Sequence, residues 1–414
     1  MQIKITCVHC GPTPVDHGVE KMGVYLDHLF GPLHRFGAFW LRLSAKILRG
    51  EITSRFVFYL LKTFSFFGVG ELVSELHSTM NYRTRVLWEA AEARGIVMHG
   101  FMFLGRPSDV LFARYGNAFM VFDALPRKRG KRSKAIEWMD NKGKMRMHFQ
   151  KAGLPVSNGA MLRTVGQGKR LFSKLDAPVI LKPSEGSRSR HTTINVINEK
   201  DLLSAIKVAK QLSPWYILEE QLEGFVYRAT VIGGDVVGVI RRMPPGVYGD
   251  GVHTIRDLVT LENKNPLRHG PIFHELETGA DADMELARQG LSWESVARQG
   301  VFVSLHPKVG RSSGAGNIDV TDETHSENIL LFKKVAEVLE ESLVGIDFII
   351  PDISKSWREQ KKTGVIEVNS LPFIDLHHYP LEGLPRDAAG RLWDVVFPGS
   401  SEVGRKPENS SKNE

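Results

Sequence analysis

Two acidic side chains interrupt apolar runs late in the sequence. Asp347 lies within the run from Val344 to Ile350, and Glu367 with Asn369 ends an apolar run that begins at Gly364. Side chains two residues apart on a strand share a face, so Glu367 and Asn369 point the same way, and Asp347 on a neighbouring strand can converge on them. Three oxygen donors without histidine or cysteine suit Mg²⁺, which keeps water ligands and shares nucleotide phosphates. The alternative is that nearby arginines hold these acids in hydrogen bonds.

Two lysines stand at the ends of predicted elements. Lys182 closes an apolar strand that begins at Ala177, and residues 183–190 after it are mostly small or basic. A loop of this composition can present backbone N–H groups and arginines to a triphosphate. Lys142 opens a predicted helix. Taken singly, a lysine in either place is more often solvated, so these two residues need further support.

Other motifs for nucleotide or hydrolytic chemistry are missing from the sequence. The fragment 166–169 reads Gly-Gln-Gly-Lys, but its spacing is wrong for a Walker A motif and neither Ser nor Thr follows it. We find neither a nucleophile elbow nor a metalloprotease helix motif. Cys7 and Cys10 form a lone C-x-x-C without a second ligand pair nearby in the sequence, so zinc or redox chemistry is the less favoured interpretation there.

The elements that position these residues alternate between helix and strand from residue 136 to about residue 397. Strands are predicted from apolar runs at 177–182, 216–220, 344–350 and 364–369. A hairpin is predicted from 227–232 and 236–240, because Gly233 and Gly234 between them accept positive φ angles.

The residues before 136 are expected to form two further regions. In residues 81–135, part of a small α/β domain is predicted, with a helix at 83–94 that Gly95 ends and a strand from Ile96. Residues 1–80 are predicted to form a short strand and then apolar helices. These helices, at 29–48 and 56–67, are interpreted as a hairpin packed on the main body, with a dimer face or a membrane-surface helix as the alternative.

Composition limits the classes of protein that remain. Of the 414 residues, 42% are hydrophobic and 24% charged, and the net charge is +7. Part of the positive excess lies in one run, 127–134, which is interpreted as a solvated linker, and no nucleic-acid partner is expected because aromatic residues are not interleaved with it. The sequence predicts no transmembrane span, because an uncharged run of 18 apolar residues does not occur. Two cysteines cannot form a disulfide framework, so a cytoplasmic location is expected.

Taken in order, the motifs resemble those of the ATP-grasp superfamily, and more narrowly the ATP-grasp domain of cyanophycin synthetases. The resemblance spans Met139 to Pro398 and rests on lysine at a helix start, lysine after a strand, glutamate in a hinge strand, an acid, and Glu-x-Asn. The similar stretches are Gly249–Ile255, Asp319–Glu323, Gly345–Asp347 with Pro351–Ile353, Ile366–Asn369 and Gly383–Arg386. Residues 1–80 resemble no family, and the Mur-ligase-like half of cyanophycin synthetase has no counterpart in the sequence.

This resemblance implies a fold and a set of domains. The fold class is α/β (α+β): an ATP-grasp fold with a partial pre-ATP-grasp α/β domain and an N-terminal helical extension. The expected divisions are 1–80 for the strand and apolar helices, 81–135 for the partial domain, 136–398 for the ATP-grasp domain, and 399–414 for a disordered tail.

The resemblance also implies a role for each candidate site residue. The implied cofactors are ATP and Mg²⁺, with Mn²⁺ as an alternative metal. Nucleotide binding is implied for Lys142, Lys182, Gly186, Ser187, Glu219 and Glu220; catalysis for Arg228, Arg242 and Arg190; and metal binding for Asp347, Glu367 and Asn369. Substrate contacts are implied for Ser313, Gly314, Asp375 and His377.

Several positions depart from the family pattern. Ser189 and His191 replace glycines of the phosphate loop, and Val226 stands where an acid for the ribose is expected. Where the family usually has an arginine after Glu-x-Asn, this chain has Asp375. The charge at this position is therefore reversed, which predicts a substrate amine beside Asp375; a salt bridge from Asp375 to Arg386 or another arginine is the alternative.

The implied activity is an ATP-dependent carboxylate–amine ligase that works through an acyl phosphate and acts on amino acids or peptides. An ATP-grasp kinase and a non-catalytic nucleotide-binding regulator are the alternatives. A homo-oligomer assembled through the N-terminal apolar helices is a further expectation.

Overall fold

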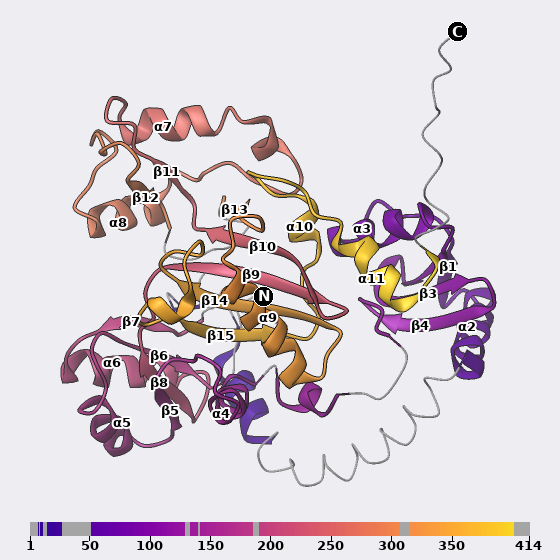
Figure 1. The fold of residues 1–414 in the computed structure, drawn as a ribbon, viewed down its shortest axis with the longest axis horizontal. Helices are drawn as coiled ribbons and strands as arrows, with labels where there is room; N and C mark the ends of the chain where they lie inside the picture. Colours follow the sequence, from indigo (N-terminus) through magenta and orange to yellow (C-terminus); the bar gives the residue numbers. More distant parts are fainter. Residues whose placement is uncertain are drawn as a thin grey trace, which may run out of the picture.

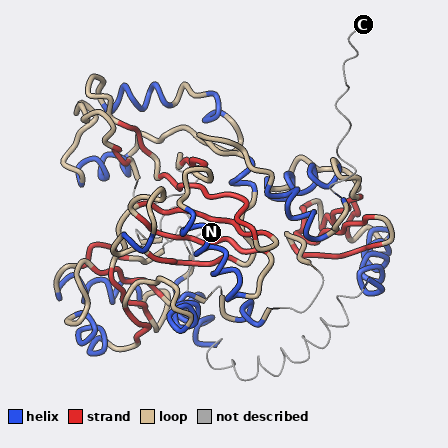
Figure 2. Tube along the Cα trace, viewed as in Figure 1, coloured by secondary structure: helices blue, strands red, loops and turns tan. Residues whose placement is uncertain are grey.

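The structure is a computed structural model that describes residues 7, 9–10, 15–26, 51–128, 133–139, 141–184, 190–306 and 314–400. A five-stranded sheet lies at the centre of the molecule, and three smaller units are arranged around it (Figure 1). Helices and strands occur in all of these units, as Figure 2 shows. The predicted α/β class is confirmed.

The central sheet is antiparallel, with its strands in the order β13-β10-β9-β14-β15. Its members are β9 (Phe225–Ile232), β10 (Asp235–Met243), β13 (Gly316–Asp319), β14 (Leu343–Ile350) and β15 (Gly364–Asn369). β9 and β10 form the predicted hairpin, and Gly233 and Gly234 in its turn have φ angles of 65° and 92°. Glycine adopts such angles without a Cβ clash, so the local sequence is sufficient to place this turn.

The two faces of the central sheet differ in chemistry. One face packs against the helix α9 (Ser326–Leu339) in a hydrophobic core. The buried strand residues of this core include Tyr227, Ala229, Val231, Val239, Val344, Ile346, Phe348, Val365 and Val368. Because side chains alternate along a strand, the residues between them, such as Arg228 and Asp347, lie on the opposite face. The sheet therefore presents a polar face away from α9.

A smaller antiparallel sheet lies beside the central one, with strand order β5-β8-β6-β7. It consists of β5 (Gly159–Leu162), β6 (Val179–Pro183), β7 (Thr193–Val196) and β8 (Tyr216–Glu220), with the helices α5 (Val165–Phe172) and α6 (Glu199–Ala209). Val179, Leu181 and Leu218 pack against Leu202 and Ile206 of α6 in its core. The helix α4 (Lys142–Lys151) contacts β15, so it connects the small unit to the edge of the central sheet.

Residues 244–306 form an insertion between β10 and β13. It contains β11 (Gly246–Tyr248), α7 (Ile255–Glu262), the short helix η2 (Pro266–His269), α8 (Ala280–Arg288) and β12 (Phe302–Ser304). The insertion has its own hydrophobic core, in which Ile255 and Val259 of α7 pack with Leu286 of α8 and Val303 of β12. In Figure 1 it lies at the upper left, and the small sheet lies below it.

The third unit lies at the opposite end of the central sheet (Figure 1). It consists of α2 (Glu51–Phe66), the antiparallel strands β1 (Gly70–Val73), β2 (Val97–Phe103), β3 (Arg106–Tyr115) and β4 (Ala118–Asp123), and α3 (Tyr82–Glu92). The C-terminal helix α11 (Ala388–Val396) packs against α3. β1 pairs with β2, so the boundary expected at residue 80 falls inside this unit. The expectation was wrong there because strand pairing joins segments on both sides of that residue.

Of the two predicted N-terminal apolar helices, the second is seen as α2. Its Phe58 ring lies 5.2 Å from the ring of Phe112 and 5.4 Å from that of Phe119, while Phe56 and Phe66 are exposed. The first helix, expected at 29–48, lies outside the described residues, as does the tail from 401, so the hairpin and the disordered tail stay predictions. Among the described residues, no helix has the length and apolar character needed to cross a membrane.

Candidate functional site

A row of charged side chains crosses the polar face of the central sheet. Arg228 on β9 lies directly opposite Asp347 on β14, and Asp347 lies directly opposite Glu367 on β15. The Nε and Nη2 atoms of Arg228 donate hydrogen bonds to the two carboxylate oxygens of Asp347 at 2.5 and 2.7 Å. The predicted convergence of Asp347 and Glu367 therefore occurs, but Asp347 also forms a buried bidentate ion pair.

This ion pair is ionised despite its burial. Burial alone raises the pKa of the Asp347 carboxyl, but the charge and hydrogen bonds of Arg228, together with Arg242 and Asn369, outweigh it and hold that pKa below its usual range. For Arg228, burial lowers the pKa, yet Asp347 raises it above the ordinary arginine value. Asp347 is thus held by an arginine, which was the alternative to metal binding. A metal ion would have to share the carboxylate oxygens of Asp347 with Arg228.

Glu367 and Asn369 are less constrained. The Glu367 side chain is 40% exposed, and one of its oxygens lies 4.0 Å from Lys142 Nζ. Asn369 lies opposite Gly345 on β14, and its side chain helps to lower the pKa of Asp347. Two carboxylates and one amide oxygen on paired strands form a donor set of the kind that Mg²⁺ takes from proteins. These residues therefore fit the predicted metal.

A second charged cluster lies on the small sheet. Lys182 Nζ on β6 lies 2.5 Å from Glu219 Oε1 on β8, and the other Glu219 oxygen accepts hydrogen bonds from Arg146 Nη1 at 2.7 Å and Ser157 Oγ at 2.8 Å. Burial favours a higher pKa for Glu219, but Lys182, Arg146 and Ser157 more than compensate, so its pKa is lowered and the carboxylate is charged. Glu219 is itself buried, and its carboxylate holds the ammonium group of Lys182 in place.

Lys142 links the two clusters. It is the first residue of α4. The side chain of Asn141 caps this helix by accepting a hydrogen bond from the backbone N–H of Lys144. Burial lowers the pKa of Lys142, and the charges that act on it come from both sheets: Glu367 and Asp347 from the central one, Lys182 and Glu219 from the small one. The two predicted lysines, the predicted acids and Arg228 thus surround one region between the sheets.

Arg146 was not among the predicted site residues. It lies four residues after Lys142 on α4, so both side chains point to the same side of that helix. Besides Glu219, it donates to the backbone carbonyl of Ser157. A lysine and an arginine at this spacing at a helix start are the signal that would have found it.

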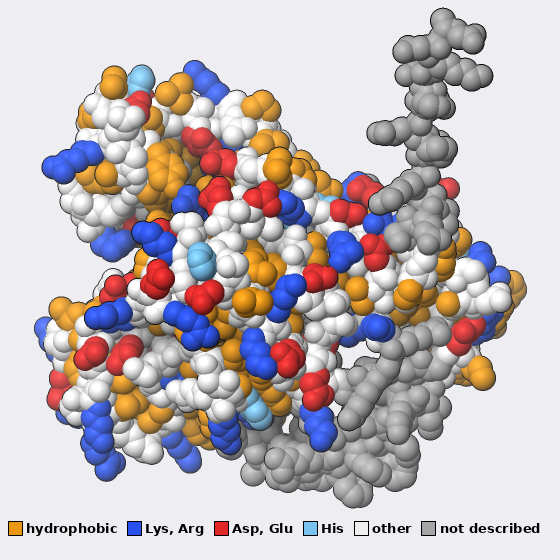
Figure 3. Space-filling view, in the orientation of Figure 1, with side chains coloured by type: hydrophobic (Ala, Val, Ile, Leu, Met, Phe, Trp, Pro, Cys, Tyr) orange, Lys and Arg blue, Asp and Glu red, His pale blue; other side chains and the backbone are white. Residues whose placement is uncertain are grey.

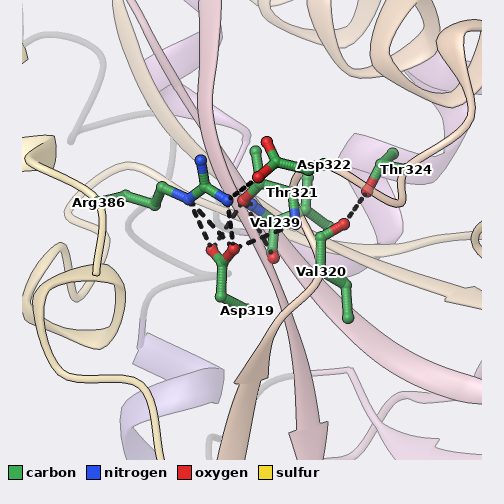
Figure 4. A network of polar contacts seen from close by, with 7 residues as sticks. All are labelled: Val239, Asp319, Val320, Thr321, Asp322, Thr324 and Arg386. Atoms are coloured by element: carbon green, nitrogen blue, oxygen red, sulfur yellow. Dashed lines mark hydrogen bonds and ion pairs between the residues drawn. The ribbon is translucent and has the colours of Figure 1, made fainter. Parts of the chain in front are cut away.

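A further polar network, drawn in Figure 4, was also missed as a site. Arg386 donates to both carboxylate oxygens of Asp319 and, at 2.7 Å, to Asp322, while Thr321 Oγ1 donates to Asp319 Oδ2 at 2.8 Å. Asp319 lies at the end of β13, whose Asn317 pairs in register with Arg242 on β10. The network therefore fixes β13 to the polypeptide after β15, next to the predicted catalytic Arg242.

The predicted substrate residues Asp375 and His377 do not face an open site. Asp375 opens the short helix α10 (Asp375–His378) and is only 2% exposed. Its alternative partner, Arg386, is bound to Asp319 and Asp322 instead. The expectation of a substrate amine at Asp375 is therefore not supported, because α10 packs this residue into the protein.

His377 is likewise buried. Its Nε2 atom shares a hydrogen bond of 2.7 Å with Thr230 Oγ1 on β9. Burial, and then the charge of Arg228, lowers the pKa of His377 to about 3, so the ring is neutral. His377 thus anchors α10 to β9 of the central sheet, two residues along the strand from Arg228.

The remaining predicted residues lie elsewhere or outside the described part. Gly186, Ser187 and Ser313 lie outside the described residues. Gly314 has a φ of 87° and packs against the backbone of residues 275–276, so its role there is conformational. Arg190 lies close enough to Cys10 for its charge to act on that thiol. Glu220 accepts a hydrogen bond from Asn158, and its neighbour Glu219 points to the other face of β8.

A cavity of about 330 Å³ adjoins the end of the polar face. It lies between the insertion and the ends of β10 and β13, and Met243 and Asn317, which line it, are immediate neighbours of Arg242 in the chain and in the sheet. Its other lining residues include Tyr248, Leu258, Leu261, Glu262, Arg268, Phe302 and Leu381. Figure 3 shows the surface hollowed between the insertion and the small unit, with basic and acidic side chains along the hollow.

The fold and the site resemble those expected of an ATP-dependent ligase, and the comparisons with known proteins point to the same class. No protein-family model matches the chain. The chain is 34% identical over 259 residues to cyanophycin synthetase of Synechocystis sp., which is 61% of this chain and 30% of that protein. It is 26% identical over 328 residues to the glutathione biosynthesis bifunctional protein GshAB of Listeria innocua, 77% of this chain and 41% of that protein.

Among solved structures, the crystal structure of a bifunctional glutathione synthetase from Pasteurella multocida is similar, with a TM-score of 0.59 and 25% identity. The match covers 77% of this chain and 44% of that one. These similarities support an assignment of the chain to the ATP-grasp superfamily. The chain spans less than half the length of these relatives, so their whole activities do not transfer to it by similarity alone.

Proposed function

We propose that this chain is an ATP-dependent ligase that joins a carboxylate to an amine through an acyl phosphate and releases ADP and phosphate. The observation that carries the proposal is the convergence of Lys142, Lys182 and Glu219 with Arg228, Asp347 and Glu367 between two sheets. The similarity to a cyanophycin synthetase and to a glutathione biosynthesis protein supports the same class of reaction.

Each group has a separate task in this proposal. Lys142 and Lys182 bind the phosphates of ATP, and Glu219 with Arg146 keeps Lys182 oriented. Glu367, Asn369 and Asp347 would hold Mg²⁺, with Mn²⁺ as an alternative, and the metal would supply charge neutralisation at the phosphates. Arg228 and Arg242 stabilise negative charge as the carboxylate attacks the γ-phosphate and as the amine displaces phosphate from the acyl phosphate.

The cavity beside Arg242 is the proposed position of a non-nucleotide substrate. Its aliphatic and aromatic lining, with the ion pair between Arg268 and Glu262 at one side, suits an amino acid or short peptide. Because Asp375 is buried, recognition of the substrate amine is assigned to this cavity rather than to Asp375.

The proposal is tested by measuring ADP release from the purified chain with amino acids, short peptides and N-acylated amino acids, each with and without amine. We expect ADP release to require both a carboxylate and an amine, and hydroxylamine to trap the acyl group as a hydroxamate. A stable phosphorylated product formed without amine would instead identify a kinase. ATP binding without turnover across the panel would identify a regulator.

Glu367→Gln is the variant of choice for the metal site. Asp347→Asn would leave buried Arg228 unpaired and cost about 3–5 kcal/mol of stability, so its loss of activity would be ambiguous. Glu367 is partly exposed, and its amide analogue keeps the shape of the side chain. We expect Glu367→Gln to abolish ADP release at an unchanged melting temperature, whereas Glu359→Gln, at an exposed glutamate, should keep full activity. Full activity of Glu367→Gln would remove Glu367 from the metal site.

A further inference from the structure

Four side chains of metal-binding type converge outside the candidate nucleotide site. They are Cys7, Cys10, His17 and His191, and their sulfur and ring nitrogen atoms all lie within 4.8 Å of one another. Cys10 and His191 are 2% and 1% exposed. Both cysteines of the chain belong to this cluster, although 174 residues separate His17 from His191.

The distances within the cluster match a tetrahedral ion. His17 Nε2 lies 3.2 Å from Cys10 Sγ, and His191 Nε2 lies 3.4 Å from Cys10 Sγ and 3.6 Å from Cys7 Sγ. Zinc bonds of about 2.3 Å to sulfur and about 2.05 Å to nitrogen give a sulfur–nitrogen edge of about 3.6 Å in a tetrahedron. A Zn²⁺ ion therefore fits between these atoms with small side-chain adjustments.

The hydrogen bonds of His191 prepare its ring for this role. Its Nδ1 atom lies 2.9 Å from the backbone carbonyl of Val208, which can only accept, so Nδ1 carries the proton. Its Nε2 atom then presents a lone pair to both sulfurs. A second ring nitrogen fixed by a carbonyl is the usual support of a zinc-bound histidine. The backbone N–H of His191 also donates to the carbonyl of His9, between the two cysteines, at 3.0 Å.

We propose that Cys7, Cys10, His17 and His191 bind a structural Zn²⁺ ion. Four protein ligands complete a tetrahedron and leave no position for water, so the site is structural rather than catalytic. Binding converts both thiols to thiolates and releases their two protons to solvent. The ion would join Cys7, Cys10 and His17 to His191, which lies two residues before β7 and directly after the predicted phosphate loop.

Two other readings of the cluster are weaker. A catalytic thiol would need access to substrate, and Cys10 is almost fully buried. A C-x-x-C redox pair would account for the two cysteines, but not for two histidines whose Nε2 atoms face the same sulfur. The zinc site accounts for all four side chains.

The test begins with the full-length chain purified under reducing conditions without a histidine tag. Elemental analysis should find about one zinc per chain. Cobalt added to the metal-free protein should give the visible bands of a tetrahedral site together with sulfur-to-cobalt charge transfer. These two measurements need no variant and do not depend on ligase activity.

Variants then identify the ligands. Cys10→Ser and His191→Asn should reduce bound zinc to background, and asparagine is chosen because it tolerates the φ of 52° at position 191. Cys7→Ser should weaken the sulfur-to-cobalt band while the protein remains folded. His9→Ala is the matched control: His9 is exposed, its carbonyl contact survives the substitution, and zinc content should be unchanged.

The proposal is overturned if the reduced wild-type chain binds neither zinc nor cobalt. It is equally overturned if His9→Ala loses zinc as fully as His191→Asn does, because the metal would then be held by a different set of ligands. A Cys7–Cys10 disulfide in the native protein, with no metal uptake after reduction, would identify a redox pair.

Discussion

At the scale of single residues, Lys182 is the side chain whose role is most directly measurable. Its side chain is 13% exposed and its ammonium group is held by Glu219, so it is oriented before any ligand arrives. We expect Lys182→Ala to weaken ATP binding by about 1.5–3 kcal/mol, or roughly 10- to 150-fold in Kd, the scale of hydrogen bonds to charged groups. Calorimetric titration measures this change, with exposed Lys174→Ala as the control. Equal ATP affinity in the two variants would place Lys182 outside the nucleotide site.

His377 is the residue for which the structure predicts a pH effect. The unfolded chain takes up a proton on this histidine below about pH 6.5, whereas the folded chain does so only near pH 3. Acidification in this window therefore favours the unfolded state, and His377 should lower the free energy of unfolding by about 2 kcal/mol between pH 7 and pH 5. Urea denaturation at the two pH values should show a smaller decrease in His377→Gln. An identical decrease in both proteins would mean that the folded histidine is protonated.

At the scale of elements, the contact between β10 and α10 depends on one glycine. A Cβ atom at Gly238 would lie 2.5 Å from His377 Nδ1, so any side chain there must push α10 away from the sheet. We expect Gly238→Ala to destabilise the protein by about 1–3 kcal/mol. In a His377→Ala background the cost should be smaller, because the two sites are coupled.

Gly166 provides the control for this element. It lies in α5, and no atom lies within 4 Å of a Cβ atom built there. Gly166→Ala should be neutral or stabilising, since alanine favours the helix.

Thermal denaturation of the single and double variants decides the role of the contact between Gly238 and His377. Additive effects of Gly238→Ala and His377→Ala would show that α10 is not held through this contact.

At the scale of the whole molecule, the N-terminal unit is attached to the central sheet by a shared core. Trp393 of α11 is fully buried, its Nε1 donates to the carbonyl of Leu87 at 2.8 Å, and its core includes Ile232 and Leu343 of the central sheet. Trp393→Ala should cost about 3–5 kcal/mol and increase hydrogen exchange in β2–β4. Trp293→Ala, in the insertion, should leave exchange in those strands unchanged. Unchanged exchange in Trp393→Ala would mean that α11 does not hold the units together.

What the sequence determined by itself is the local pattern of the ATP-grasp core. Strand alternation is a property of neighbouring residues, so it placed Glu367 and Asn369 on one face, and paired glycines placed the β9–β10 turn. Tertiary structure alone decided which distant side chains meet. Arg228 pairs with Asp347 across 119 residues, and Cys7 meets His191 across 184. Neither pairing leaves a local pattern, because such contacts follow from how sheets and segments pack. The same reason explains why Asp375, which the sequence predicted beside a substrate, is buried inside the protein at the start of α10.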